Sequence, residues 1–418
     1  MEYKKIINNE YTLHLVNTNR FKTINVVMFL TKKFNKNDIP YGNLLVQNLL
    51  YTSKKYNTKA KMSGIYEDLY GCKVSGSFGF TGMCESFVFS LDFINPKYTS
   101  NKYYDKTLDY FKEILFNPNV LNNKFNQKYF DILKQDNISS IKSIKDNPRI
   151  FSSIEYSKLM YKGTPGEFSA YPKLENIEKI TSEDLYNFYK TLFNGSYKID
   201  VVVLGEISDA FKEKLENILS FVKGNNKKLS FKVEHKYDTK LIKKIDSLPF
   251  NQSRLYIGYR LLNFNYHEML HVMRVYNTIL GTMNDSILFN IVREENSLCY
   301  TVGSYYSRYN PSLTIYAGIN KKNYEQTVEL IKKCVDDMSN KNKVKRLFES
   351  AKKTINTYLN NYYDDVSLQI NKYYDSEFET IEDVETLRNN INKVTIDEII
   401  NLNKKIKLST IYLLKGDN

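Results

Sequence analysis

Hydrophobic and polar residues follow two different periods along this chain. In residues 11–16, 23–30 and 86–93 apolar and polar residues alternate along the chain, which predicts strands of a half-buried sheet. In residues 41–51 and 126–144 apolar side chains recur every three or four positions, which predicts amphipathic helices. The first half of the sequence therefore predicts an α+β fold.

The second half repeats this order of elements. The same periods predict strands at residues 253–259, 300–306 and 313–318, with helices at 266–280 and 324–338. The two halves therefore have the same sequence of predicted elements, which indicates a duplicated α+β unit.

One passage of each half also has a similar amino-acid sequence, KITSEDLYNFYKTLF in the first half and KVTIDEIINLNKKI in the second. Each has a threonine before the predicted helix and an acidic residue three positions later. The pairs are Thr181 with Asp184 and Thr395 with Glu398. This spacing is that of a capping box, in which the two side chains satisfy free backbone N–H groups at a helix start.

The repeat predicts two homologous domains. We place the N-terminal domain at residues 1–222 and the C-terminal domain at residues 241–418, joined by a basic linker at residues 223–240. A repeat of this length is too long for a solenoid and suits tandem domains.

Composition narrows the class of protein. The chain has 418 residues, of which 42% are hydrophobic, enough for more than one packed core. The formal charge of +13 would suit an acidic partner, but the lysines are spread along the whole chain, so we do not expect nucleic-acid binding.

The four cysteines are far apart and indicate reduced thiols. With no apolar run long enough for a membrane span and no signal-peptide core at the start, we expect a cytoplasmic protein.

The pentapeptide HEMLH, residues 267–271, fits the HExxH pattern of zinc metalloproteases. On a helical wheel, His267 and His271 fall on the polar face, opposite Met273 and Tyr276. Arg274 shares the polar face and would repel a divalent cation. We expect a helix with two exposed histidines; an adventitious metal there, or zinc catalysis, remains an open alternative.

The segment NTILGTMNDSILFNIVREENSLCYTVGSYYS, residues 277–307, resembles the C-terminal half of peptidase family M16, the insulinase or pitrilysin-like metalloproteases. The family's phrases N-x-x-L-G, S-R-L-F and R-E-K-x-G-L-A-Y correspond here to 277–281, 286–289 and 293–300. The resemblance implies two homologous M16-type (LuxS/MPP-like) α+β domains, each an antiparallel sheet with packed helices, enclosing a chamber. Residues 65–80, IYEDLYGCKVSGSFGF, are similar to the zinc-motif-lacking YfmF-like group of this family.

The resemblance also implies two site residues. In the family, an arginine and a tyrosine seven residues later contact the substrate opposite the zinc ion, and the matching residues here are Arg293 and Tyr300. A fixed cation and a phenol can bind a peptide carbonyl and stabilise the charge that develops on it. Arg293 and Tyr300 are therefore the expected catalytic groups.

The family's zinc motif, H-x-x-E-H on the first helix of the first half, is degenerate in this chain. The matching segment is YGNLLVQNLLYTSKK, and a third ligand would lie on a later helix. The positions of the two histidines, the base and the third ligand are occupied by Asn43, Gln47, Val46 and Ser140, respectively. Amides bind zinc weakly and valine cannot act as a base. No histidine occurs between His14 and His235, so no shift of register restores the site.

These features predict a zinc-free subunit of a heterodimeric M16 metallopeptidase, because some bacterial members of the family work as heterodimers. The partner would carry H-x-x-E-H and the zinc ion, this chain would bring the arginine and tyrosine, and a peptide would be the substrate. The chain itself is expected to hold no metal. The alternative is a non-enzymatic peptide-binding or scaffold protein that holds an extended peptide by strand addition.

Overall fold

The computed structural model describes residues 1–99, 103–235 and 240–417, and these form two compact units. Unit 1 comprises Met1–Ser143, Ser169–Phe231 and Tyr363–Ile381. Unit 2 comprises Ile144–Phe168, Lys232–Tyr362 and Glu382–Asn418. Among the described residues, no helix is long and apolar enough to cross a membrane.

Unit 1 is built on a six-stranded sheet with the order β1-β2-β8-β3-β5-β4. Strands β2 and β8 are parallel and the other neighbours are antiparallel. The strands are β1 (Glu2–Ile7), β2 (Thr12–Asn17), β3 (Thr23–Lys33), β4 (Lys73–Thr81), β5 (Cys84–Ile94) and β8 (Lys198–Gly205). A separate two-stranded hairpin is formed by β6 (Val120–Leu121) and β7 (Lys124–Phe125).

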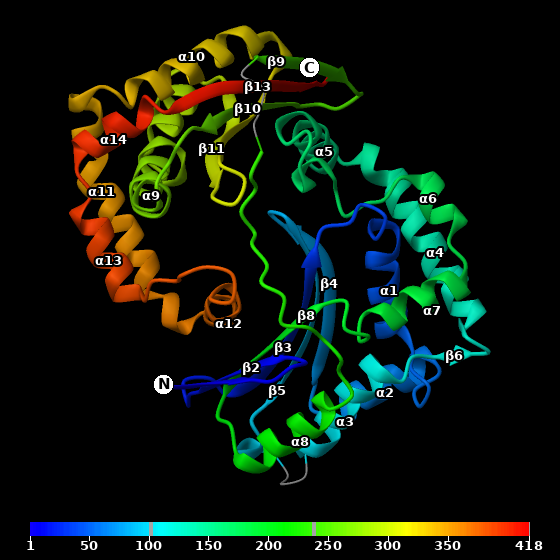
Figure 1. Ribbon diagram of the computed structural model, residues 1–418. Helices are drawn as coiled ribbons and strands as arrows, with labels where there is room; N and C mark the ends of the chain where they lie inside the picture. The colour runs from blue at the N-terminus through cyan, green and yellow to red at the C-terminus, as the bar shows by residue number, and fades with distance from the viewer. Residues whose placement is uncertain (100–102, 236–239, 418) are drawn as a thin grey trace. The chain divides into compact units, whose positions relative to one another are not determined.

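Helices cover both faces of this sheet. The larger layer comprises α1 (Ile39–Tyr51), α2 (Lys59–Asp68), α3 (Tyr103–Phe116), α4 (Gln127–Lys142), α6 (Leu174–Lys179), α7 (Ser182–Thr191) and α8 (Asp209–Leu219) (Figure 1). Alternate strand residues such as Leu13, Leu15 and Val201 point into this layer and are fully or almost fully buried. The intervening residues point to the opposite face, where α12 (Val366–Asp375) packs: the Tyr374 ring stacks on Phe29 with centroids 3.8 Å apart.

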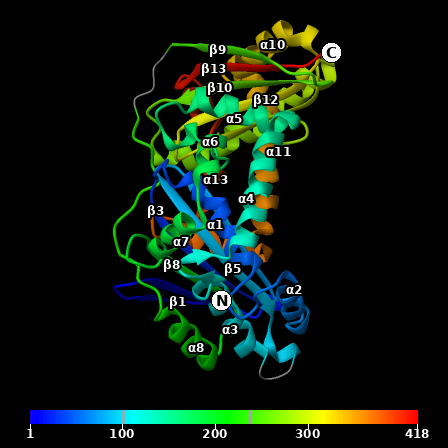
Figure 2. The same cartoon turned by 90° about the vertical axis from the view of Figure 1, so that its right-hand side faces the viewer.

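Unit 2 is built on a five-stranded sheet with the order β11-β12-β10-β13-β9, in which β9 and β13 are parallel. The strands are β9 (Ile242–Ser247), β10 (Ser253–Leu261), β11 (Cys299–Ser307), β12 (Ser312–Ile319) and β13 (Ile406–Lys415), and β12, β10, β13 and β9 appear in this order in Figure 2. This topology matches β4-β5-β3-β8-β2 of unit 1 strand for strand. The predicted α+β fold and its duplication are therefore confirmed.

The helices of unit 2 include several π-helical turns. The α-helices are α9 (Met273–Asn277), α10 (Tyr324–Asp337), α11 (Lys341–Asn360), α13 (Val384–Lys393) and α14 (Ile396–Asn403). The π-helical segments are η4 (Glu268–Val272), η5 (Thr278–Thr282) and η6 (Phe289–Glu295). Short 3₁₀ turns complete the two units: η1 (Pro96–Tyr98), η2 (Ser143–Asp146), η3 (Pro165–Glu167), η7 (Lys321–Asn323) and η8 (Tyr362–Asp364).

Each half of the chain contributes one helix to the unit built mainly from the other half. Helix α5 (Pro148–Met160) packs on β10 and β13 of unit 2, where Tyr156 and Met160 lie in one apolar cluster with Tyr256. Its counterpart α12, which follows α11 as α5 follows α4, packs on β8 of unit 1. The compact units therefore differ at these two helices from the contiguous domains expected at 1–222 and 241–418.

Candidate functional site

Helix α1 carries most of the degenerate zinc motif. Its apolar residues Leu44, Leu45 and Leu49 are buried in the core of unit 1, and Val46 is also buried, with 4% of its surface exposed. Val46 therefore serves packing, in the place where the family would have a general base.

The polar members of the motif form ordinary amide hydrogen bonds. Asn43 is half-buried and its Nδ2 donates to the backbone carbonyl of Ala170 at 3.2 Å. Gln47 is exposed, and its Oε1 accepts a hydrogen bond from Asn137 Nδ2 of α4 at 2.6 Å. Both side chains thus have neutral partners and bring no charge to the site.

The structure brings Asn137, and not Ser140, to the motif on α1. Ser140 is exposed, and its hydroxyl donates to the Asp136 carbonyl of its own helix at 2.9 Å. Asn137 lies three residues earlier, almost one helical turn, and is the residue that bonds to Gln47. Counting back from Pro148 in the sequence places the third ligand position at Ser140, three residues away from Asn137. A search for the polar residue one turn away on the same helix would have found it.

This set of donors does not fit a zinc ion. Asn43, Gln47 and Asn137 offer neutral amides, whereas zinc sites in proteins use thiolates, imidazoles and carboxylates. Among the described residues, the only group of three His, Cys, Asp or Glu side chains close enough to share a metal ion lies elsewhere, at His14, Asp200 and Glu377. No catalytic step is therefore assigned to a metal at α1.

Arg293 lies on the π-helical segment η6 of unit 2. Its guanidinium carbon is 4.6 Å from the centroid of the Phe289 ring, and its Nε is 3.6 Å from Glu294 Oε1. The side chain is 42% exposed, so the aromatic ring supports the cation on one side while solvent reaches it on another.

Tyr300 lies at the start of β11, which forms one edge of the sheet of unit 2. The register with β12 passes from Cys299 opposite Ile319 to Thr301 opposite Gly318, so Tyr300 is the extra residue of a β-bulge. Tyr300 is 81% exposed and lines a pocket of about 360 Å³. A bulge turns a side chain out of the regular alternation, and such bulges are frequent beside active sites.

Cys299, next to Tyr300, lines the same pocket. Burial raises the pKa of its thiol to about 11, although the positive charge of Arg293 opposes this rise. The thiol is therefore mostly protonated at neutral pH, which makes it a slow nucleophile.

The HEMLH segment differs from the expectation that both histidines are exposed. His267 has a side chain that is 43% exposed, but the side chain of His271 is only 3% exposed. The helical wheel was wrong here because residues 268–272 form a π-helix, whose wider turn rotates His271 inward, and because α13 and α14 pack on it.

The two imidazoles of HEMLH face each other and two carboxylates. Their Nδ1 atoms are 2.9 Å apart, while His267 Nε2 is 2.9 Å from Glu398 Oε1 and His271 Nε2 is 2.9 Å from Glu382 Oε2. Glu268, the glutamate of the pattern, is held by Lys405 at 2.5 Å. All four ring nitrogens thus have protein partners, and the glutamate points to a lysine instead of a metal-bound water.

Comparison with known proteins finds a family model and two bacterial proteins to which this chain is similar. Residues 179–355 match the family model of the peptidase M16 inactive domain. The chain is 26% identical over 416 residues to the "Probable inactive metalloprotease YmfF" of Bacillus subtilis strain 168, covering 97% of this chain and 96% of the relative. It is also 28% identical over 270 residues to the "Uncharacterized zinc protease YmxG" of the same strain, covering 62% of this chain and 63% of the relative. The first of these relatives agrees with the resemblance, drawn from the sequence, to the zinc-motif-lacking group of family M16 named YfmF-like.

Solved structures share the fold along the whole chain. A conserved protein from Enterococcus faecalis V583 has a TM-score of 0.90 at 22% identity, covering 99% of each chain. A peptidase M16 inactive domain from Pseudomonas fluorescens has a TM-score of 0.80 at 16% identity, covering 100% of this chain and 99% of the other. The match of residues 179–355 to the inactive-domain model and the full-length similarity to a probable inactive metalloprotease make this chain similar to the inactive homologues of the M16 metalloproteases.

Proposed function

We propose that this chain is the zinc-free subunit of a heterodimeric M16 peptidase, in which Arg293 and Tyr300 complete the active site of a partner that carries H-x-x-E-H. The observation that carries the proposal is the position of Tyr300, which a β-bulge turns outward beside a pocket at the open edge of a sheet. The absence of zinc ligands on α1 gives the reason why a partner is required. The same proposal places the subunit in the cytoplasm and makes a peptide its substrate.

The chemistry of the two side chains suits peptide hydrolysis. A phenol hydroxyl and a guanidinium are hydrogen-bond donors that can bind a peptide carbonyl, and both bind more strongly as negative charge develops on its oxygen. Tyr300 is exposed enough to reach a substrate, and Arg293 is a permanent cation. The zinc ion that activates water would belong to the partner. Bacillus subtilis strain 168 contains relatives of both descriptions, one named inactive and one named a zinc protease, which supports a paired arrangement.

The test combines this chain with a purified H-x-x-E-H homologue from the same genome. Cleavage of a fluorogenic peptide library would be measured for the mixture with wild-type chain, Arg293→Ala or Tyr300→Phe. Removal of one donor to a developing oxyanion typically lowers kcat by about 10²–10³-fold, and we expect a loss of this order for each variant.

Matched controls are available on α11. Arg346→Ala and Tyr358→Phe remove the same groups from exposed positions of unit 2 and should leave the rate unchanged. Equal activity of the Arg293 and Tyr300 variants and these controls would contradict the proposal, as would failure of the mixture to exceed the partner alone.

The alternative, a non-enzymatic peptide-binding protein, is favoured by one further observation. In the sheet of unit 2, β11 is an edge strand, and within the described parts of the chain it pairs only with β12, so its outer edge can accept an added peptide strand. Under this alternative, peptides bind the chain without a partner, and no mixture cleaves them. Fluorescence anisotropy of labelled peptides, measured beside the cleavage assay, separates the two functions.

A further inference from the structure

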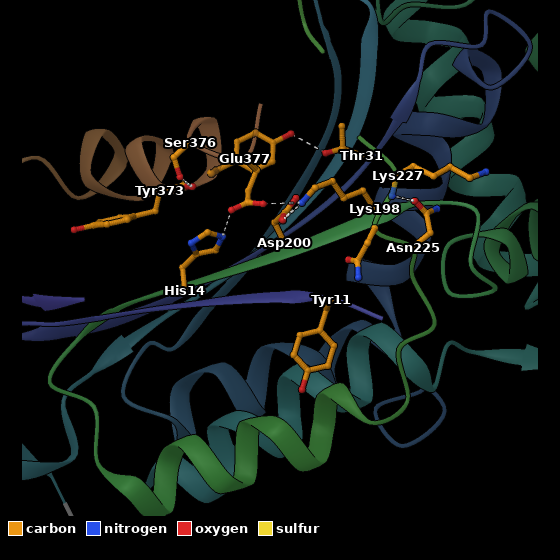
Figure 3. Close-up of polar contacts among 12 residues, drawn as sticks. Tyr11, His14, Thr31, Lys198, Asp200, Asn225, Lys227, Tyr373, Ser376 and Glu377 are labelled. Carbon is orange, nitrogen blue, oxygen red and sulfur yellow. Dashed lines mark hydrogen bonds and ion pairs between the residues drawn. The ribbon is translucent and has the colours of Figure 1, made fainter. Parts of the chain in front are cut away.

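A second group of ligating side chains lies in unit 1, on the sheet face opposite the α1 layer. Its members are His14 on β2, Asp200 on β8 and Glu377, which follows α12 (Figure 3). Parallel pairing of β2 with β8 sets Thr12 opposite Asp200 and His14 opposite Val202, so His14 and Asp200 are diagonal neighbours on one face. Helix α12 then brings Glu377 from a distant part of the sequence onto the same face.

The three side chains present one ligand atom each to a common point. These atoms, an imidazole nitrogen and two carboxylate oxygens, all lie within 4.8 Å of one another. His14 and Asp200 are fully buried, and the side chain of Glu377 is 10% exposed. Among the described residues, neither His14 Nε2 nor Asp200 Oδ2 has a hydrogen-bond partner, and the charged group facing Nε2 is Glu377 Oε1 at 3.5 Å. Buried polar atoms without partners are costly, by about 1–3 kcal/mol each, which indicates that these two atoms bind something else.

The remaining polar atoms of the cluster are held in place by neighbours. The hydroxyl of Tyr3 is 2.8 Å from His14 Nδ1. Lys198 bonds to Asp200 Oδ1, and its Nζ is also 3.3 Å from Glu377 Oε2. Metal-binding histidines and carboxylates are commonly oriented in this way, through hydrogen bonds to the atoms that do not touch the metal.

We infer that His14, Asp200 and Glu377 form a binding site for a divalent transition-metal ion, with zinc as the reference ion. One imidazole and two carboxylates are a ligand set used for zinc, and the surrounding bonds leave His14 Nε2 and Asp200 Oδ2 free to ligate. A bound ion would fasten Glu377, and with it the end of α12, to the sheet of unit 1.

Charge balance identifies the competitor for this ion. Two carboxylates face two lysines, Lys198 and Lys5, and the four charges cancel. Lys198 is buried and holds the outer carboxylate oxygens. Lys5 is 35% exposed, and its Nζ is 2.5 Å from Glu377 Oε1, the oxygen nearest to His14. A metal ion must displace Lys5, which can move into solvent, while Lys198 stays in place.

The experiment uses the full chain without a partner, so its result is independent of the proposed peptidase role. The protein would be stripped with a chelator, dialysed and titrated with zinc by calorimetry, with stoichiometry checked by elemental analysis. Cobalt would be titrated in parallel, because its visible spectrum reports ligation by protein groups. We expect one equivalent of metal, and an increase of the melting temperature on binding.

Variants of the cluster give opposite shifts. Glu377→Gln should weaken binding at least about tenfold, whereas Lys5→Gln should tighten it because the competing cation is removed. Lys5 is partly exposed, so this variant keeps the fold even where a change at a buried ligand does not. His267→Asn changes a histidine of the HEMLH segment, outside the cluster, and as the matched control it should leave the affinity for the metal unchanged.

Three results would overturn the inference. The first is no stoichiometric metal on the wild-type chain, in which case the cluster is a self-neutralised ion network. The second is metal binding that is lost in His267→Asn, which would place the ion at HEMLH. The third is an affinity that Glu377→Gln and Lys5→Gln leave unchanged.

Discussion

Tyr374 is one of the side chains that attach α12 to the sheet of unit 1. Its ring stacks on Phe29 at 3.8 Å between centroids. Its hydroxyl lies 2.7 Å from Thr31 Oγ1 and 3.2 Å from Ser86 Oγ. Ring and hydroxyl can be removed separately, by Tyr374→Ala and Tyr374→Phe.

The two substitutions should lower the free energy of unfolding by different amounts. In Tyr374→Phe, the hydroxyls of Thr31 and Ser86 remain 3.1 Å apart and can bond to each other, so neither is left without a partner. We therefore expect a loss of about 0.5–1.5 kcal/mol, the net value of one hydrogen bond. In Tyr374→Ala, the packing of the ring is lost as well, and large-to-small changes of buried aromatic residues cost about 3–5 kcal/mol.

Urea unfolding followed by circular dichroism measures these differences, because the chain contains no tryptophan to report by fluorescence. Hydrogen exchange of residues 363–381 shows whether α12 detaches before unit 1 unfolds. The control Tyr358→Ala removes a tyrosine that is 57% exposed, and should cost under about 0.5 kcal/mol. The reasoning fails if Tyr374→Ala costs less than about 1 kcal/mol, or if Tyr374→Phe costs as much as Tyr374→Ala.

Three further predictions concern the stability and reactivity of the chain. Burial raises the pKa of Glu85 to about 8, so the folded protein holds a proton that the unfolded chain releases near its ordinary pKa of about 4.5. The free energy of unfolding should therefore fall by up to about 1.4 kcal/mol per pH unit between these two pKa values. Urea unfolding at pH 5 and pH 8 measures this fall, which should be smaller in Glu85→Gln. Gly42→Ala should lower the melting temperature because the added Cβ would lie 2.0 Å from the Phe78 ring, whereas Gly64→Ala, with nothing within 4 Å, should raise it slightly. Cys299 is half-buried and should be the first cysteine that iodoacetamide labels in the native protein, as peptide mass spectrometry would show. Earlier labelling of one of the buried cysteines, Cys72, Cys84 or Cys334, would contradict this prediction.

The local features of the fold could be predicted from the sequence. Both capping boxes are present as expected, with Thr181 and Asp184 at the start of α7 and Thr395 and Glu398 at the start of α14. Such features depend on residues three or four positions apart, which a sequence displays directly. The exchange of α5 and α12 could not be predicted, because periodicity shows which face of a helix is apolar but not which sheet it covers.

The sites show the same limit. Degeneracy of the zinc motif was readable because Asn43, Val46 and Gln47 lie within one helical turn. The burial of His271 was not, because a π-helical turn is decided by packing and not by the local pattern. The roles of Arg293 and Tyr300 remain predictions.

The exchange of helices also has a consequence for the order in which the chain is synthesised. Residues of unit 1 up to Phe231 leave the ribosome long before residues 363–381, so the sheet must wait for α12 while more than a hundred further residues are translated. The part of the sheet that waits carries polar groups, among them His14, Thr31 and Lys198, which water can solvate in the meantime. A nascent chain stalled before residue 363 should therefore hold a sheet that is complete in its hydrogen bonds and still open on one face.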